Sequence, residues 1–293
     1  TTPNIEKYIS GYILFDETLR QKATSGASFA SILQSKGIDI GIKVDGGTVD
    51  FPDHPGEKTT KGLEGLDERL KEYKNLGATF AKWRSVYTIG ENTPSESLMQ
   101  ANAEIFAKYA TLCQENDIVP IVEPEVLMDG AHDLEKCHQV TARNLQVVFE
   151  GLKSANVYLP GIILKTNMAI PGEDSEVAVG AVEIAKSTVK CLKENVPPEI
   201  GGIVFLSGGQ KDDEAVANLN EMHQLGALPW PLTFSYGRAI QNPALKSWAA
   251  NPNDVIEAQK LLVKAAENNS LASVGEYGSA KSFPERTNDE TQN

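Results

Sequence analysis

The sequence predicts an α/β fold built around a parallel β-sheet, and two regularities along the chain carry that prediction. Short apolar runs rich in Ile, Val and Phe alternate with longer polar stretches in which apolar residues recur at helical spacing. The runs show no polar face, as is typical of strands that are buried on both sides. Strand and helix alternating in this way is the pattern of successive βαβ units.

Seven apolar runs are predicted to be strands. They lie at residues 12–15, 40–44, 79–83, 118–122, 161–164, 203–206 and 232–234. Helical spacing occurs between them at residues 66–73, 98–113, 134–152, 177–192 and 213–225. No linker or low-complexity segment interrupts residues 11–271, so the sequence predicts one domain over this stretch.

The position of the polar residues distinguishes a barrel from an open sheet. An open doubly wound sheet accepts seven strands, whereas a (β/α)8 or TIM barrel needs eight. Nearly every run ends in a charged or hydroxyl side chain, which favours the barrel, because an open sheet gathers such residues at one switch point. We therefore expect a single TIM-barrel domain over residues 1–275, with its first βα unit missing before Thr1, and a mobile tail at residues 276–293.

Composition excludes several classes of function. The formal net charge of -13 would repel a nucleic acid, and no basic run offsets it. No run approaches the roughly 18 apolar residues of a membrane span. The three cysteines are too widely spaced for a metal motif, so we expect buried thiols, and we expect the three tryptophans, Trp83, Trp230 and Trp248, in the core.

Charged residues come in pairs at three successive strand ends. Because residues two apart on a strand face the same side, both members of each pair should point into the barrel mouth. One such pair alone would most simply be a structural ion pair, but three in succession predict a site. The pairs are Lys43 with Asp45, Lys82 with Arg84, and Glu123 with Glu125.

Lys165 ends a strongly apolar run and would enter the same mouth. Taken alone, a lysine at a strand end is equally well a solvated surface charge. Neighbouring cations and burial favour the neutral amine, however, and a neutral amine can attack a carbonyl carbon to form a Schiff base. Glu123 and Glu125, one strand away, supply the carboxyl group that such chemistry needs for proton transfer.

Two strand-to-helix turns offer groups that bind phosphate. Ser207 and Gly208 come directly after one apolar run and are followed by a second glycine. Bare backbone N–H groups in such a turn can bind an anion. A tight turn without a ligand would use the same glycines. Ser235, Gly237 and Arg238 follow the next run and add a hydroxyl and a guanidinium, and loops after the last two barrel strands commonly hold phosphate.

The sequence segments that contain these residues, taken together and in their order, resemble those of the metal-independent, class I fructose-bisphosphate aldolases of the muscle and plant kind. The likeness extends over residues 11–271. The matching strings are GIKVD at 41–45, FAKWR at 80–84, PIVEPE at 120–125, ILKTNM at 163–168, FLSGGQ at 205–210 and TFSYGR at 233–238. The family usually has proline where this chain has Thr166.

The resemblance implies a catalytic role for four residues. Lys165 would be the Schiff-base nucleophile, and Glu123 would exchange protons at the carbinolamine intermediate. Glu125 would orient the catalytic lysine, and Lys82 would support the proton transfers.

The resemblance also implies how substrate is bound. Lys43 and Arg84 would contact the hydroxyl groups and one phosphate end of the substrate. Four residues would hold the phosphate next to the ketone: Ser207, Gly208, Gly237 and Arg238. An Asp that the family carries on its first strand, and further phosphate ligands beside it, have no counterpart in this sequence.

The activity implied is that of a lyase. It is the reversible cleavage of fructose 1,6-bisphosphate to dihydroxyacetone phosphate and glyceraldehyde 3-phosphate, in glycolysis, gluconeogenesis or carbon fixation. The family uses no metal or organic cofactor and is usually a homotetramer. We therefore expect a cytoplasmic protein, with the plastid as the alternative, and neither a nucleic-acid nor a membrane partner.

Two other functions are compatible with a barrel of this kind. One is a different Schiff-base aldolase, such as a transaldolase or a deoxyribose-phosphate aldolase, although two phosphate loops favour a bisphosphate substrate. The other is a non-catalytic barrel that serves as a scaffold. The retention of Lys82, Glu123 and Lys165 argues against the scaffold, since a scaffold has no need of a buried lysine facing a carboxylate.

Overall fold

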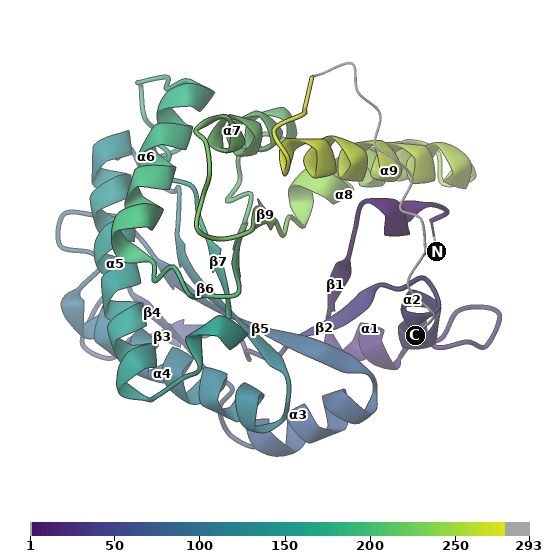
Figure 1. The fold of residues 1–293 in the computed structure, drawn as a ribbon, viewed down its shortest axis with the longest axis horizontal. Helices are drawn as coiled ribbons and strands as arrows, with labels where there is room; N and C mark the ends of the chain where they lie inside the picture. Colours follow the sequence, from purple (N-terminus) through teal and green to yellow (C-terminus); the bar gives the residue numbers. More distant parts are fainter. Residues whose placement is uncertain (1, 279–293) are drawn as a thin grey trace.

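The computed structural model describes residues 2–278, and its centre is one curled, parallel β-sheet (Figure 1). The strand order is β1-β2-β5-β6-β7-β8-β9, so strands that follow one another in the sheet also follow one another along the chain, apart from the separate hairpin of β3 and β4. The strands of the sheet are β1 Gly11–Leu14, β2 Asp39–Lys43, β5 Ala78–Tyr87, β6 Val119–Val126, β7 Ile163–Thr166, β8 Gly202–Phe205 and β9 Leu232–Phe234.

Helices connect the strands and cover the outside of the sheet. Figure 1 shows α3 to α6 following one another around the outer face. The α-helices are α1 Asp16–Arg20, α2 Phe29–Gln34, α3 Leu66–Asn75, α4 Glu96–Glu115, α5 Leu134–Ser154, α6 Ala181–Asn195, α7 Asp212–Gln224, α8 Arg238–Ala250 and α9 Val255–Ala272. Two short 3-10 helices, η1 Ile5–Lys7 and η2 Leu159–Gly161, complete the regular structure.

The starts of the two longest helices, α4 and α5, are fixed by capping side chains. Ser95 accepts a hydrogen bond from the N–H of Leu98 at the start of α4, and Asp133 accepts one from Lys136 at the start of α5. Such caps satisfy backbone donors that have no partner inside the helix. They place the ends of α4 and α5 so that the apolar face of each helix meets the sheet.

The predicted fold class and the seven predicted strands are confirmed. All six contacts between neighbouring strands of the sheet are parallel, as βαβ connections require. The helix predicted from residue 177 was wrong at its start, because α6 begins at Ala181, where Gly180 donates its N–H to the Glu183 carboxylate. Residues 279–293, most of the predicted tail, lie outside the described residues.

The sequence did not reveal the hairpin formed by β3 Thr48–Asp50 and β4 Lys58–Thr60. Its strands are three residues long, β3 is exposed throughout and β4 is mostly polar, so both lack the apolar run by which the other strands were found. Arg69 ties the base of this hairpin to the sheet by donating hydrogen bonds to the carbonyl oxygens of Val44 and Gly62. The hairpin therefore braces the loop that leaves β2.

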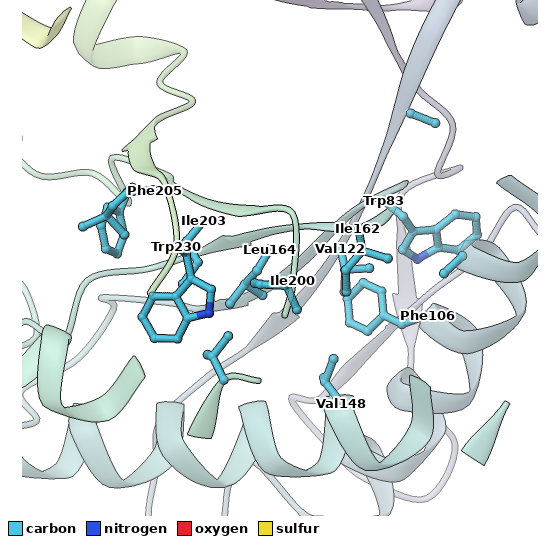
Figure 2. Packing of buried hydrophobic residues seen from close by; sticks show 14 of the residues in the cluster. Trp83, Phe106, Val122, Val148, Ile162, Leu164, Ile200, Ile203, Phe205 and Trp230 are labelled. Carbon is cyan, nitrogen blue, oxygen red and sulfur yellow. The ribbon is translucent and has the colours of Figure 1, made fainter. Parts of the chain in front are cut away.

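The hydrophobic core lies between the outer face of the sheet and the helices. Figure 2 shows Phe106 of α4 and Val148 of α5 packed toward the strand residues Val122 and Leu164 and toward Ile162, which directly precedes β7. Each of these side chains is at most marginally exposed to solvent. This layer of apolar contacts is what holds the strands in register and supports the polar face of the sheet.

The predicted burial of cysteines and tryptophans is confirmed with one exception. All three thiols are buried, as are Trp83 and Trp230. Trp248 is 52% exposed, so its assignment to the core was wrong. The reason is that α8 buries only Ala239 and Ile240 at its beginning, and Trp248 lies near its other end.

No α-helix in residues 2–278 combines the length and the apolar character needed to cross a bilayer.

Leu164 provides a direct test of the core. We expect Leu164→Ala to lower the free energy of unfolding by about 2–5 kcal/mol, because Leu164 is fully buried in β7 and its loss leaves a cavity. Urea denaturation followed by circular dichroism measures this. Leu245→Ala, on the exposed side of α8, is the matched control and should change stability by about 0.5 kcal/mol or less. Equal losses in both variants would contradict the assignment of the core.

Candidate active site

The parallel register brings the charged strand ends to one mouth of the sheet. Lys43 of β2 is the register partner of Lys82 on β5, and Arg84 of β5 is the partner of Glu123 on β6. The intervening residues Ala81 and Trp83 are buried in the core, so Lys82 and Arg84 point the opposite way, to the inner face. The prediction that the three pairs converge is confirmed by these positions.

Five charged side chains form a continuous row of ion pairs in the mouth. The Lys165 Nζ lies 3.0 Å from Glu123 Oε1, and the Lys82 Nζ lies 3.0 Å from Glu123 Oε2. On its other side the Lys82 Nζ is 3.4 Å from Asp45 Oδ2. Asp45 Oδ1 in turn is 2.5 Å from the Nζ of Lys43. Three amines therefore alternate with two carboxylates along this row, which runs from β7 through β6 and β5 to the end of β2.

Burial makes these contacts strong. The side chains of Asp45 and Glu123 are each 4% exposed, Lys82 is 8% exposed and Lys165 is 12% exposed. Burial opposes ionisation of Asp45, but the charges and hydrogen bonds of Lys82 and Lys43 outweigh it and lower the pKa of that carboxyl below its usual value. The site therefore holds an ionised Asp45 at neutral pH.

Glu125 belongs to a second ion pair beside the first. Arg84 donates a hydrogen bond from Nε to Glu125 Oε2, and the Glu125 side chain is buried. Burial opposes the charge on Arg84, and the Glu125 carboxylate outweighs it and raises the pKa of the guanidinium. Glu125 is therefore engaged by Arg84 and does not reach Lys165 in any ion pair found within the described residues.

Three of the amines open onto one cavity of about 620 Å³. Lys43, Lys82 and Lys165 line it from three strands, and Ser235 and Gly237 line it from the end of β9. A cavity of this size accommodates a small phosphorylated sugar, since ligand pockets typically measure about 300–1,000 Å³. The amine expected to be the nucleophile thus has both a partner carboxylate and access to a ligand space.

The two predicted phosphate turns lie at the ends of β8 and β9, which are neighbours in the sheet. Gly208 and Gly209 have φ angles of 60° and 91°, so both occupy the left-handed region where other residues are strained. Arg238 begins α8 directly after Gly237, and a Cβ added at Gly209 would lie 3.9 Å from its guanidinium. Ser207, Gly208 and Arg238 are not among the residues that line the lysine cavity itself.

Asn167 supports the site in a way that the sequence analysis did not identify. Its Oδ1 accepts a hydrogen bond from the backbone N–H of Val126, and its Nδ2 donates one to Thr141 Oγ1. These contacts tie the end of β7 to β6 and α5, two residues from Lys165. Its position shortly after Lys165 was the feature of the sequence that could have indicated this role. An amide side chain can donate and accept hydrogen bonds in many settings, however, so the position alone did not identify its partners.

Phe15 was also overlooked, because it ends the apolar run predicted at residues 12–15 and was therefore interpreted as a core residue. It is 63% exposed, lines the cavity, and lies with its ring 5.7 Å from the Lys43 Nζ, within the range of a cation–π contact. In the part of the chain that the structure describes, no group of three or more His, Cys, Asp or Glu side chains is arranged to hold a metal ion.

A curled parallel sheet with a lysine, its carboxylate and a ligand cavity at the carboxyl ends of the strands defines an enzyme of the α/β-barrel class. The family model described as fructose-bisphosphate aldolase class-I matches residues 1–292. The chain belongs to the class I fructose-bisphosphate aldolase family. The family is one of Schiff-base lyases, and the resemblance stated from the sequence is confirmed.

Relatives and a solved structure agree with this assignment. A probable fructose-bisphosphate aldolase class 1 of Xanthomonas axonopodis pv. citri is 52% identical over 278 residues, which cover 94% of this chain and 83% of the relative. Cytosolic fructose-bisphosphate aldolase 4 of Arabidopsis thaliana is 50% identical, covering 94% and 71%. The structure of the Plasmodium falciparum fructose-bisphosphate aldolase, in complex with TRAP and an inhibitor, superposes with a TM-score of 0.92 at 45% identity, covering 94% of this chain and 80% of that one.

Asp45 gives the site a testable dependence on pH. Because its pKa is lowered in the folded protein, the stabilisation it provides is present above the unfolded value of about 3.9 and is lost as pH falls through the folded value. We expect Asp45→Asn to lower the free energy of unfolding by about 3–5 kcal/mol at pH 7, since it removes the buried negative charge that lies between the Lys43 and Lys82 amines.

Urea denaturation at pH 7, 5 and 3 measures this difference, which should shrink below about pH 4. Asp50→Asn, on the exposed hairpin, is the surface control for loss of one carboxylate. A difference for Asp45→Asn that stays constant over this pH range would show that its charge is not the source of the stability.

Proposed function

We propose that this chain catalyses the reversible cleavage of fructose 1,6-bisphosphate to dihydroxyacetone phosphate and glyceraldehyde 3-phosphate, through a Schiff base on Lys165. The observation that carries the proposal is the Lys165 amine, which lines a cavity of about 620 Å³ and lies 3.0 Å from Glu123. Membership of the family supports the same reaction.

The neutral amine of Lys165 attacks the ketone carbon of the substrate and forms a carbinolamine. Glu123 gives a proton to the carbinolamine hydroxyl, which leaves as water and produces an iminium ion. The iminium accepts the electron pair of the C3–C4 bond as that bond breaks, while the Glu123 carboxylate left by the previous step takes the proton of the C4 hydroxyl. Glyceraldehyde 3-phosphate departs, the resulting enamine takes up a proton at C3, and hydrolysis of the iminium releases dihydroxyacetone phosphate.

Neighbouring residues support these steps. Lys82 is held 3.0 Å from Glu123 and stabilises its carboxylate between proton transfers. Glu125 fixes Arg84, which together with Lys43 binds the hydroxyl groups and one phosphate end of the substrate. This assigns Glu125 an indirect part in orienting the site, through Arg84.

The phosphate beside the ketone is assigned to the turns after β8 and β9. The left-handed glycine pair expose backbone N–H groups, and Arg238 adds a charged donor at the start of α8. The residues proposed to hold this phosphate are Ser207, Gly208, Ser235, Gly237 and Arg238.

The proposal includes the setting of the enzyme. The reaction needs no metal or organic cofactor, because the iminium itself accepts the electrons, and it places the protein in glycolysis, gluconeogenesis or carbon fixation. We propose a cytoplasmic location, with the plastid as the alternative, on the support of Arabidopsis relatives that are named cytosolic. We also propose a homotetramer, with no nucleic-acid or membrane partner.

Trapping the covalent intermediate tests the mechanism. We expect incubation with dihydroxyacetone phosphate and borohydride to give a reduced adduct on Lys165, located by peptide mass mapping, because reduction fixes the iminium. Lys165→Met should remove both the adduct and the cleavage activity, whereas Lys186→Met, on the exposed face of α6, is the matched control and should retain both. Glu123→Gln should lower kcat by about 10²- to 10⁴-fold.

The absence of an adduct on folded protein would contradict the Schiff-base mechanism and favour a non-catalytic scaffold. An adduct together with faster turnover of a monophosphate ketose would instead favour another Schiff-base aldolase.

Sedimentation equilibrium tests the assembly. For a homotetramer, the molecular mass measured by sedimentation should be four times the chain mass of 31.7 kDa, at a protein concentration near that of the activity assay. A mass that stays at one chain over the accessible concentration range would contradict the proposed tetramer.

A further inference from the structure

Asp45 was predicted from the sequence to lie in the mouth together with Lys43, but the proposed reaction gives it no role. It follows β2 and lies between lysines from two strands, with its Oδ1 at 2.5 Å from the Lys43 Nζ and its Oδ2 at 3.4 Å from the Lys82 Nζ. Its side chain is only 4% exposed, so Asp45 is buried in the wall of the mouth.

Backbone donors hold this carboxylate in place. The N–H of Gly47 donates to Oδ1 at 3.3 Å, and the N–H of Arg84 donates to Oδ2 at 3.4 Å. Asp45 is therefore anchored both to its own loop and to the neighbouring strand β5. Its geometry does not depend on a bound substrate.

Glu123, by contrast, is shared. It contacts the amines of both Lys82 and Lys165 at 3.0 Å, and in the proposed reaction it gives up and regains a proton. Once protonated, Glu123 no longer balances a positive charge. Lys82 is 8% exposed, and a buried ammonium without a counter-ion is strongly unfavourable.

We propose that Asp45 is a positioning residue that holds the Lys82 ammonium independently of Glu123, so that Glu123 can exchange protons with the substrate while Lys82 stays charged and in place. This role rests on the proposed function, since it has meaning only if Glu123 changes its protonation state during turnover. Asp45 itself does not touch the substrate.

A purely structural role for Asp45 makes a different prediction. If Asp45 only closes the end of β2, its loss would lower stability and leave the chemistry of the remaining folded enzyme unchanged. If it holds Lys82, its loss lowers kcat in the folded enzyme and has little effect on KM. Lys43, which contacts substrate in the proposed function, also donates a 2.8 Å hydrogen bond to the backbone carbonyl oxygen of Asp45, and we expect Asp45→Asn to leave this bond intact because it changes only the side chain.

The experiment compares Asp45→Asn with wild type at pH 7, on protein shown to be folded by circular dichroism. We expect kcat to fall by about 10- to 100-fold, as for a misplaced catalytic group, with KM changed by less than about threefold. Asp50→Asn removes a carboxylate from the adjacent hairpin, where its side chain is 91% exposed, and should match wild type. An unchanged kcat for Asp45→Asn would overturn the proposal.

A double-variant cycle shows whether Asp45 acts through Lys82. In a Lys82→Met background, Asp45→Asn should change kcat by less than about threefold, because the group that it positions is gone. Equal proportional losses in both backgrounds would overturn the proposal. If Asp45→Asn alone does not fold, the kcat of Lys82→Met is compared with that of the double variant. Neither of these proteins contains an unpaired Lys82 ammonium, so both should fold. Equal kcat values support the proposal, and a further loss in the double variant overturns it.

The borohydride adduct separates this proposal from the proposed function. Wild-type protein that forms no adduct on Lys165 refutes the Schiff-base mechanism itself. Wild type that forms the adduct and cleaves fructose 1,6-bisphosphate, beside an Asp45→Asn variant of undiminished kcat, refutes only the role of Asp45.

Discussion

The site depends on a single constraint: three lysines, of which Lys82 is buried and Lys43 and Lys165 are partly exposed, must be kept close together without uncompensated charge. Lys43, Lys82 and Lys165 come from three strands, and two carboxylates stand between them. Three amines face two carboxylates, so one amine can be neutral while the remaining charges balance. A neutral amine is the form that attacks a carbonyl group, and the composition of the cluster therefore suits an amine nucleophile.

The apolar layer behind the sheet makes this arrangement possible. Inner and outer faces alternate along β5, so that Lys82 is flanked by Ala81 and Trp83, which are both packed in the core. Phe106 and Val148 press the helices against the strands and fix the register between them (Figure 2). A shift of one residue in β5 would exchange its core side chains with its charged ones, so the core specifies the site as firmly as it specifies the fold.

Loops at the same end of the sheet complete the mouth. The hairpin after β2 is braced by Arg69, Asn167 ties β7 to its neighbours, and the glycine pair after β8 adopts a conformation that only glycine takes without strain. The comparisons with known aldolases agree with this organisation over 94% of the chain. The electrostatics of the mouth also set it apart from the rest of an acidic protein, because its exposed groups are cations that attract a phosphorylated substrate.

The order of strands and helices, the polar residues at the strand ends and the family could all be predicted from the amino-acid sequence alone. This was possible because buried parallel strands produce apolar runs of recognisable length, and because residues two apart necessarily share a face. The sequence did not reveal the short hairpin or the exposure of Trp248, for which the local pattern is weak.

Which charged side chains meet could be learned only from the three-dimensional structure. Spacing along one strand placed Glu123 and Glu125 on the same face, but it could not show that Glu123 contacts Lys82 and Lys165 while Glu125 pairs with Arg84. Nor could it show that Asp45 lies against Lys82. These contacts cross between strands, and they depend on the relative register and tilt of the strands, which are set by how the whole sheet curls against its helices.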